Sequence, residues 1–128
     1  MIEITIVLLC GVGFYASAFM YRKTLRAGRG QLAEPSVVES DRARVLGGVP
    51  NALFGMAYYG GVAACVPFLH VHAVGVAAWA ASLAAAAASI YLAHSLLFVT
   101  RMPCAYCWTS HGVNALLPVL LIAAQRLG

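Results

Sequence analysis

Charged residues are scarce in this chain, which has four Asp or Glu and eight Lys or Arg among 128 residues. Charged residues make up 9% of the sequence and apolar residues 62%, a balance that few soluble domains of this size reach. The scarcity of charge excludes an ordinary soluble globular protein. No polar stretch is long enough to form a soluble appendage, so we expect a single domain, residues 1–128, embedded in a membrane.

Long apolar runs fill most of the sequence. A helix needs about 20 mostly apolar residues to cross the roughly 30 Å hydrocarbon layer. Four stretches satisfy this requirement: residues 4–21, 50–69, 73–99 and 103–124. They predict an all-α integral membrane protein, built as a bundle of four transmembrane helices. No basic residue precedes the first run and no convincing small-residue cleavage site follows it, so we expect that run to be retained rather than removed as a signal peptide.

Residues 22–49 form the one substantial connection. Its first part is polar and broken by glycine, but Pro35 suits the first position of a helix, and Gly47 and Gly48 suit a helix end. Apolar and charged side chains interleave between these positions. We therefore expect a short helix at about residues 36–46 that lies along the membrane surface. A solvated loop is the alternative.

Basic residues lie almost entirely on one side of the predicted bundle. Seven fall in the first and third connections, which share a side when there are four spans, and one falls at the opposite face. They are Arg22, Lys23, Arg26, Arg29, Arg42, Arg44 and Arg101 on the first side and Arg126 on the other. This distribution is typical of topology determinants and not of a nucleic-acid-binding surface. The positive-inside rule then places the basic side in the cytoplasm and both termini outside.

The segment "MPCAYCWTSH", residues 102–111, places two cysteines at the start of the last apolar run. Cys104 and Cys107 are three residues apart, so on a helix they share a face and their sulfurs come close enough to form a disulfide. Pro103 marks the first helical turn, where unpaired backbone N–H groups and the positive end of the helix dipole favour the thiolate. The spacing predicts a dithiol that is reversibly oxidised without movement of the backbone.

Other uses of this cysteine pair have less support in the sequence. A structural zinc site needs four ligands, and the remaining cysteines, Cys10 and Cys65, belong to other depths of the predicted bundle. A c-type haem attachment needs His after the second cysteine, where this chain has Trp108. Two alternatives stay open: a pair of inert buried cysteines, and a metal site that includes His94 and His111 on adjoining helices.

Two stretches carry a family resemblance, "GVPNALFGMAYY" at the start of the second span and "MPCAYCWTSHGVNALL" at the start of the fourth. With the order of the spans, the chain resembles the vitamin K epoxide reductase family, which includes disulfide-forming homologues in bacteria and archaea. The resemblance covers nearly the whole chain. It implies a quinone pocket inside the four-helix bundle, with a ubiquinone or menaquinone as the electron acceptor.

The resemblance also implies roles for individual residues. Cys107 would contact the quinone, and Cys104 would exchange with an external thiol. Asn51 would form a hydrogen bond with a quinone oxygen, and Phe54 and Tyr59 would line the ring site.

Further polar residues interrupt the apolar runs. His111 stands where the animal enzymes have a tyrosine donor, and its imidazole can donate a hydrogen bond or carry a proton. Asn51 has an alternative role as the cap of the second helix. His94, Ser110 and Asn114 lie within spans, where polar groups tend to face a bundle interior. We expect each of these three to form a hydrogen bond between helices.

The first connection contains no cysteine. Family members usually carry a second cysteine pair there to relay electrons, and many bacterial forms have a fused thioredoxin-like domain. We therefore expect a separate thioredoxin-like protein to reduce the chain directly, so that it acts as a membrane thiol:quinone oxidoreductase and promotes protein disulfide formation. The alternatives are a metal or metalloid permease and a non-catalytic subunit of a membrane complex. Because the dithiol lies on the basic side, we expect it to face the cytoplasm, opposite to most prokaryotic relatives.

Overall fold

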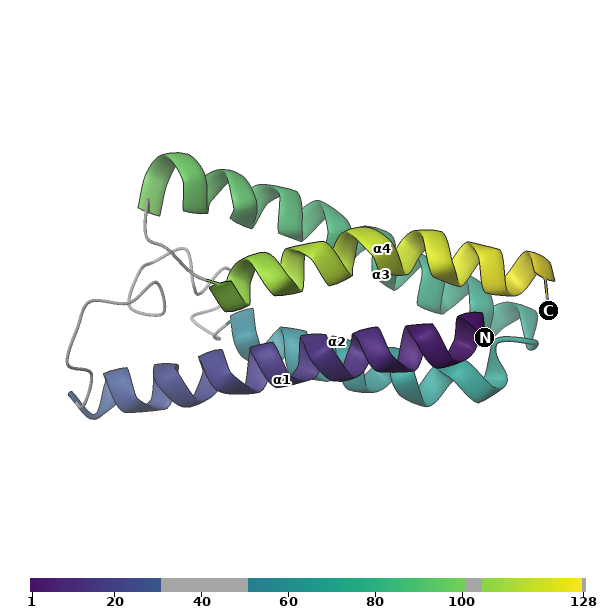
Figure 1. The fold of residues 1–128 in the computed structure, drawn as a ribbon, viewed down its shortest axis with the longest axis horizontal. Coiled ribbons are helices and arrows are strands. Elements are labelled where there is room, and N and C mark those ends of the chain that lie inside the picture. The colour runs from purple at the N-terminus through teal and green to yellow at the C-terminus, as the bar shows by residue number, and fades with distance from the viewer. Residues whose placement is uncertain (31–50, 101–104, 128) are drawn as a thin grey trace.

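The computed structural model describes residues 1–30, 51–100 and 105–127 (Figure 1). The elements are α1 (Ile2–Gly28), α2 (Asn51–Cys65), the 3₁₀-helix η3 (Val66–Phe68), α3 (His72–His94), the π-helix η4 (Ser95–Thr100) and α4 (Ala105–Leu127). These ranges contain no strand, which confirms the predicted all-α fold. The short helix expected at residues 36–46 lies outside the described residues.

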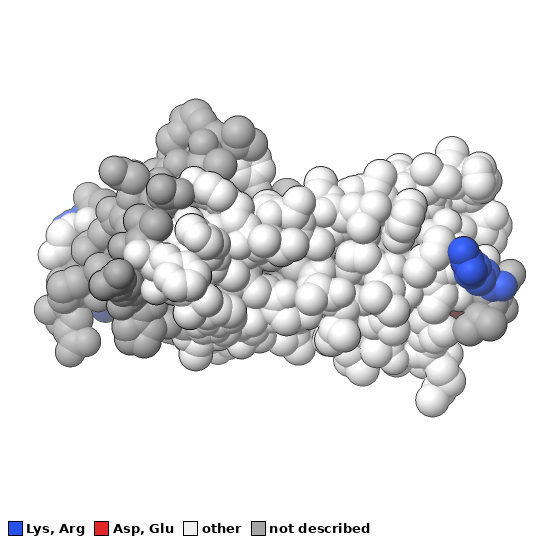
Figure 2. All heavy atoms as spheres, turned by 90° about the horizontal axis from the view of Figure 1, so that it is seen from above, with Lys and Arg blue, Asp and Glu red and all other residues white. Residues whose placement is uncertain are grey.

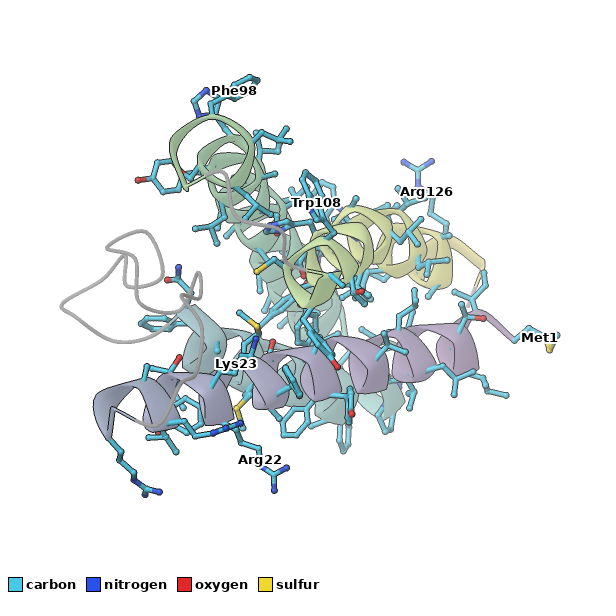
Figure 3. The ribbon with its side chains drawn as sticks, turned by 60° about the vertical axis from the view of Figure 1, so that its left-hand side comes forward. Met1, Arg22, Lys23, Phe98, Trp108 and Arg126 are labelled. Atoms are coloured by element: carbon cyan, nitrogen blue, oxygen red, sulfur yellow. The ribbon has the colours of Figure 1, made fainter. Side chains whose placement is uncertain are left out.

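The four α-helices run along the long axis of the molecule, and each reverses the direction of the one before it (Figure 1). α1 lies against both α2 and α4, and α3 lies against α4. Both chain ends are at one end of the bundle, while α2 and α4 begin at the other. The C-terminal part of α3, together with η4, diverges from α4 (Figure 1 and Figure 3).

Three helices are long and apolar enough to cross a membrane: Ile2–Ala27 in α1, His72–Phe98 in α3 and η4, and Ala105–Arg126 in α4. Between 22% and 28% of each apolar window is buried within the protein. Most of their apolar surface therefore faces outward, as in proteins that contact lipid. The chain is a multi-pass membrane protein.

α2 differs from the prediction because its 15 described residues end at Cys65, before the predicted end at residue 69. An α-helix of that length extends about 22 Å, whereas the hydrocarbon layer is roughly 30 Å thick. The chain continues from Cys65 into η3, which contains Pro67, and three residues of 3₁₀-helix add about 6 Å. The span predicted at residues 50–69 is thus a short α-helix extended by a 3₁₀ turn.

α1 is longer than the apolar run that predicted it, because the helix continues to Gly28. Arg22, Lys23 and Arg26 therefore lie in the helix and not, as expected, in the connection. Arg, Lys and Leu are good helix formers, and positive side chains near a helix C-terminus interact favourably with its dipole. The helix has ended before Gly30, which adopts a φ of +68°, a conformation that glycine tolerates best.

The hydrophobic core lies where α1, α2 and α4 meet. Its largest fully buried side chain is Tyr59. The same core includes Ile6, Cys10, Leu117 and Leu121. The ring of Tyr59 lies so close to Gly13 of α1 that a Cβ at residue 13 would be 2.5 Å from the ring Cζ atom. Glycine at this position therefore allows α1 and α2 to approach each other.

Charged side chains gather at the two ends of the bundle. The face in Figure 2 shows basic side-chain atoms at one end and no charged side chain across its middle, and Arg126 lies in the last turn of α4. The cluster Arg22, Lys23, Arg26 and Arg29 follows the apolar part of α1 at the other end. Within the described ranges, most basic residues thus lie at the end where α4 begins.

Candidate active site

The first turn of α4 contains a cysteine in a disulfide. α4 begins at Ala105, so Cys107 lies where the sequence placed it. Cys107 is half-buried and disulfide-bonded, whereas Cys10 and Cys65 are free thiols. Cys104, the other member of the predicted dithiol, lies outside the described residues. The oxidised sulfur is therefore at a helix start, and both free thiols lie on other helices.

Aromatic rings attach this turn of α4 to α1. Tyr106 stacks on Phe19, with ring centroids 4.0 Å apart and planes inclined by 18°. Tyr106 also meets Tyr15 with a centroid distance of 6.4 Å. The ammonium of Lys23 lies 5.6 Å from the centroid of Phe19. Aromatic pairs contribute about 1 kcal/mol beyond their buried area, so the residue directly before Cys107 fixes the turn against α1.

A buried hydrogen-bond network, which we call the Tyr59 network, joins three helices below that turn. The hydroxyl of Tyr59 on α2 donates to Oδ1 of Asn114 on α4 at 2.6 Å, and the backbone carbonyl of Ser110 lies 3.3 Å from the same hydroxyl. Nδ2 of Asn114 donates to Oγ of Ser89 on α3 at 2.5 Å. The expected helix-to-helix bond of Asn114 is confirmed, and Ser110 takes part through its carbonyl. Tyr59 was expected to line a quinone ring site. Its hydroxyl instead forms hydrogen bonds to α4 within this network.

His111 lies one helical turn after Cys107. The spacing places Cys107, His111, Asn114 and Gln125 on one side of α4. Asn114 and Gln125 both donate hydrogen bonds to α3, so this side faces α3. His111 is half-buried, and the ring of Trp108 meets it edge-on at 5.7 Å and 85°. Cys107 and His111 are thus brought together at the level where α3 diverges from α4.

The remaining candidate residues lie farther from the core. Asn51 is the first residue of α2 and is half-buried, while Phe54 in the same turn is 44% exposed. His94 is exposed, and its ring lies 5.0 Å from that of Phe98. The expectation that His94 faces the bundle interior is wrong. At the C-terminal end of α3, the imidazole lies near a bundle end and packs beside an aromatic ring instead of a neighbouring helix.

A metal centre has no support in the described ranges. Within them, no three His, Cys, Asp or Glu side chains lie close enough to hold an ion. A site on His94 and His111 would need ligands from elsewhere in the chain.

Two parts of the site were missed by the sequence interpretation. Ser89 was not among the candidate residues, yet it accepts the hydrogen bond of Asn114. An isolated serine in an otherwise apolar run is a signal that could have identified it, since a buried hydroxyl needs a partner. The stack of Phe19 on Tyr106 had no such signal, because aromatic residues are common near the ends of membrane helices.

The sequence model of the Vitamin K epoxide reductase family matches residues 4–122. The match extends from the first turn of α1 into the last turns of α4. None of the curated proteins matches the chain.

Proposed function

Because the chain belongs to the vitamin K epoxide reductase family, a family of oxidoreductases, we propose that it is a membrane thiol:quinone oxidoreductase. It oxidises a soluble thioredoxin-like dithiol protein and passes two electrons to a membrane quinone of the ubiquinone or menaquinone type. The observation that carries this proposal is the disulfide of Cys107 in the first turn of α4, while Cys10 and Cys65 are free. We propose Cys104 as its redox partner.

The chemistry of the pair balances as an exchange of two electrons. A thiolate of the reduced partner attacks the sulfur of Cys104, which breaks the disulfide and releases Cys107 as a thiolate. The second thiolate of the partner then attacks the partner's own sulfur in the mixed disulfide, so the partner leaves oxidised and Cys104 is released as a thiolate, which takes up a proton from water. A bound quinone supplies an acceptor for two electrons and two protons and departs as quinol. Cys104 and Cys107 regain their disulfide as they give up those electrons.

The residues around Cys107 fit a quinone. Nδ1 of His111 is buried and has no hydrogen-bond partner in the described part of the chain. A buried polar atom of this kind is costly unless something satisfies it, and a quinone oxygen accepts a hydrogen bond from an imidazole N–H. Asn51 and Phe54 occupy the first turn of α2, at the same end of the bundle as Cys107. We assign Asn51 a contact with a second quinone oxygen and Phe54 a contact with the ring, while Tyr59 acts deeper through its bonds to α4.

The dithiol end is proposed to face the cytoplasm. Arg22, Lys23, Arg26 and Arg29 lie at the end where α4 begins, and Arg126 lies at the end that carries both termini. Positive residues favour the cytoplasmic side of a bacterial-type membrane. The same charge distribution therefore supports outward-facing termini and an active site that works on cytoplasmic thiols.

Turnover by the purified protein tests the proposal. The protein in detergent is supplied with dithiothreitol and a short-chain ubiquinone, and quinone reduction is followed by absorbance. We expect Cys107→Ser and Cys104→Ser to abolish turnover, because neither variant can form the disulfide. Cys65→Ser is the matched control, since it removes a half-buried free thiol from α2 and should retain the rate.

The alternatives predict different results in this assay and in a transport assay with vesicles. A non-catalytic subunit would show no turnover, and neither active-site cysteine would matter. A metal or metalloid permease would move ions into vesicles without oxidising dithiothreitol. Full activity of Cys107→Ser would overturn the proposed dithiol.

A further inference from the structure

Three arginines follow the apolar run of α1, two of them in the helix and the third at its C-cap. Arg22 and Arg26 are four residues apart in α1, which aligns them along the helix, and Arg29 follows three residues later as the C-cap residue. All three are exposed, and none forms an ion pair with the described part of the chain. Figure 3 shows Arg22 directed away from the bundle, whereas Lys23 is directed toward it. We call these three residues the arginine stripe.

The arginine stripe extends from the depth of the lipid headgroups to beyond it. The apolar run to Tyr21 is long enough to cross the hydrocarbon layer, and each further residue advances the helix by about 1.5 Å. Arg26 and Arg29 therefore lie about 7 and 12 Å beyond Tyr21, whereas the headgroup layer adds only about 5–7 Å on each side. The positive-inside rule counts charges but does not require them to share a helix face. The stripe thus offers positive charge to the aqueous phase.

The arginine stripe and the disulfide lie at the same end of the bundle. Phe19 of α1 stacks on Tyr106, the residue before Cys107, so the disulfide end of α4 is level with the last apolar turn of α1. A soluble protein that reaches this end from the aqueous phase passes the exposed turns that follow. Glu3 is the one acidic residue in the described ranges, and it lies in the first turn of α1 at the opposite end. No acidic side chain in those ranges therefore neutralises the stripe.

We propose that Arg22, Arg26 and Arg29 form a docking surface for an acidic face of the soluble dithiol protein that reduces the disulfide. This inference rests on the proposed function for the identity of the partner. Complementary charge across an interface accelerates association and orients the partner, and both effects weaken as salt rises. The stripe would therefore determine which protein dithiols reach the pair, without affecting small uncharged thiols.

Direct binding and turnover together test the docking surface. The protein is placed in nanodiscs of phosphatidylcholine, which expose both membrane faces and contain no anionic lipid. A thioredoxin of net negative charge is the probe for binding, and dithiothreitol is the control substrate for turnover. The triple variant Arg22→Gln, Arg26→Gln, Arg29→Gln is compared with Arg126→Gln, which removes an exposed charge at the opposite end.

Each exposed ion pair changes affinity by up to about fivefold. The triple variant should therefore bind thioredoxin about tenfold more weakly at low salt, and the difference should vanish at high salt. Turnover of dithiothreitol and the binding by Arg126→Gln should be unchanged. Equal thioredoxin binding by the triple variant and the unaltered protein would overturn the docking surface. So would a difference that appears only after phosphatidylglycerol is added, because the stripe would then bind lipid.

The two proposals fail separately in this design. If the unaltered protein does not oxidise dithiothreitol, the proposed function fails, while the binding measurement still decides whether the arginine stripe docks an acidic protein. If dithiothreitol is oxidised but the triple variant binds thioredoxin as tightly as the unaltered protein, the oxidoreductase proposal stands and the docking surface is wrong.

Discussion

Gly13 is the position where one added methyl group tests the packing of the core. The ring atoms Cζ, Cε1 and Cε2 of Tyr59 would lie 2.5, 2.6 and 2.8 Å from a Cβ at residue 13. The ring cannot simply move aside, because Asn114 and Ser110 on α4 hold its hydroxyl. Gly13→Ala must therefore push α1 away from α2 or break the bonds of Tyr59 to α4.

The cost of Gly13→Ala follows from these two effects. Overpacking of a core costs about 1–3 kcal/mol, and the loss of a hydrogen bond between membrane helices adds roughly 0.6 to 1.7 kcal/mol. Gly11→Ala is the matched control, because a Cβ at residue 11 meets nothing within 4 Å. Both substitutions gain the same helix preference of Ala over Gly, about 1 kcal/mol. We therefore expect Gly13→Ala to be less stable than Gly11→Ala by about 2–4 kcal/mol.

A thiol inside the core reports the unfolding. Cys10 is buried, so a thiol-reactive fluorophore labels it when the bundle opens, and Cys65→Ser in every variant removes the competing half-buried thiol. Unfolding in mixed micelles with increasing dodecyl sulfate then gives the free-energy difference. In a Tyr59→Phe background the ring has no hydroxyl to bond to α4 and can move. The loss of unfolding free energy caused by Gly13→Ala should then be smaller. A difference between Gly13→Ala and Gly11→Ala below about 0.5 kcal/mol would refute this account of the core.

Three further outcomes are expected. Asn114→Ala loses two interhelix side-chain bonds and should destabilise the protein by about 1–3 kcal/mol in the same unfolding assay; an unchanged midpoint would contradict the network. His111→Phe removes a donor worth about 1.4 kcal/mol, so quinone reduction should slow about tenfold while reduction of the disulfide by dithiothreitol is unchanged. With Cys10 and Cys65 replaced, an impermeant thiol reagent should label reduced Cys104 only after cells are permeabilised, and labelling of intact cells would show that the dithiol faces outward.

Among the described residues, the ends of the helices were less predictable than their order. Apolar runs mark where a chain enters lipid, but a helix ends where its backbone conformation changes. α1 continues past the apolar run because Arg22 and Lys23 are good helix formers, and it ends at Gly28. α2 ends at Cys65, although the apolar run continues to Leu69, because the backbone tightens into a 3₁₀-helix that contains Pro67. Hydropathy alone does not distinguish these conformations.

The candidate site was predictable where a single segment determines the geometry. The position of Cys107 in a first helical turn followed from the neighbouring Pro103 and the cysteine spacing. The position of His94 did not follow from its segment. A polar side chain near the end of a span can face another helix or lie exposed at the bundle surface, and the latter arrangement is observed.

Pairings between helices depend on their relative register, which the pattern of one helix does not encode. The sequence showed that Asn114 needs a partner, because an unsatisfied amide in apolar surroundings is costly. Its choice of Tyr59 and Ser89 depends on how far α2 and α3 are displaced along α4. Gln125 fixes the same register near the other end of α4 through the carbonyl of Gly75. Beyond these two levels the C-terminal part of α3 diverges from the first turns of α4 (Figure 1), which leaves the side of α4 that carries Cys107 and His111 open to the quinone that we propose.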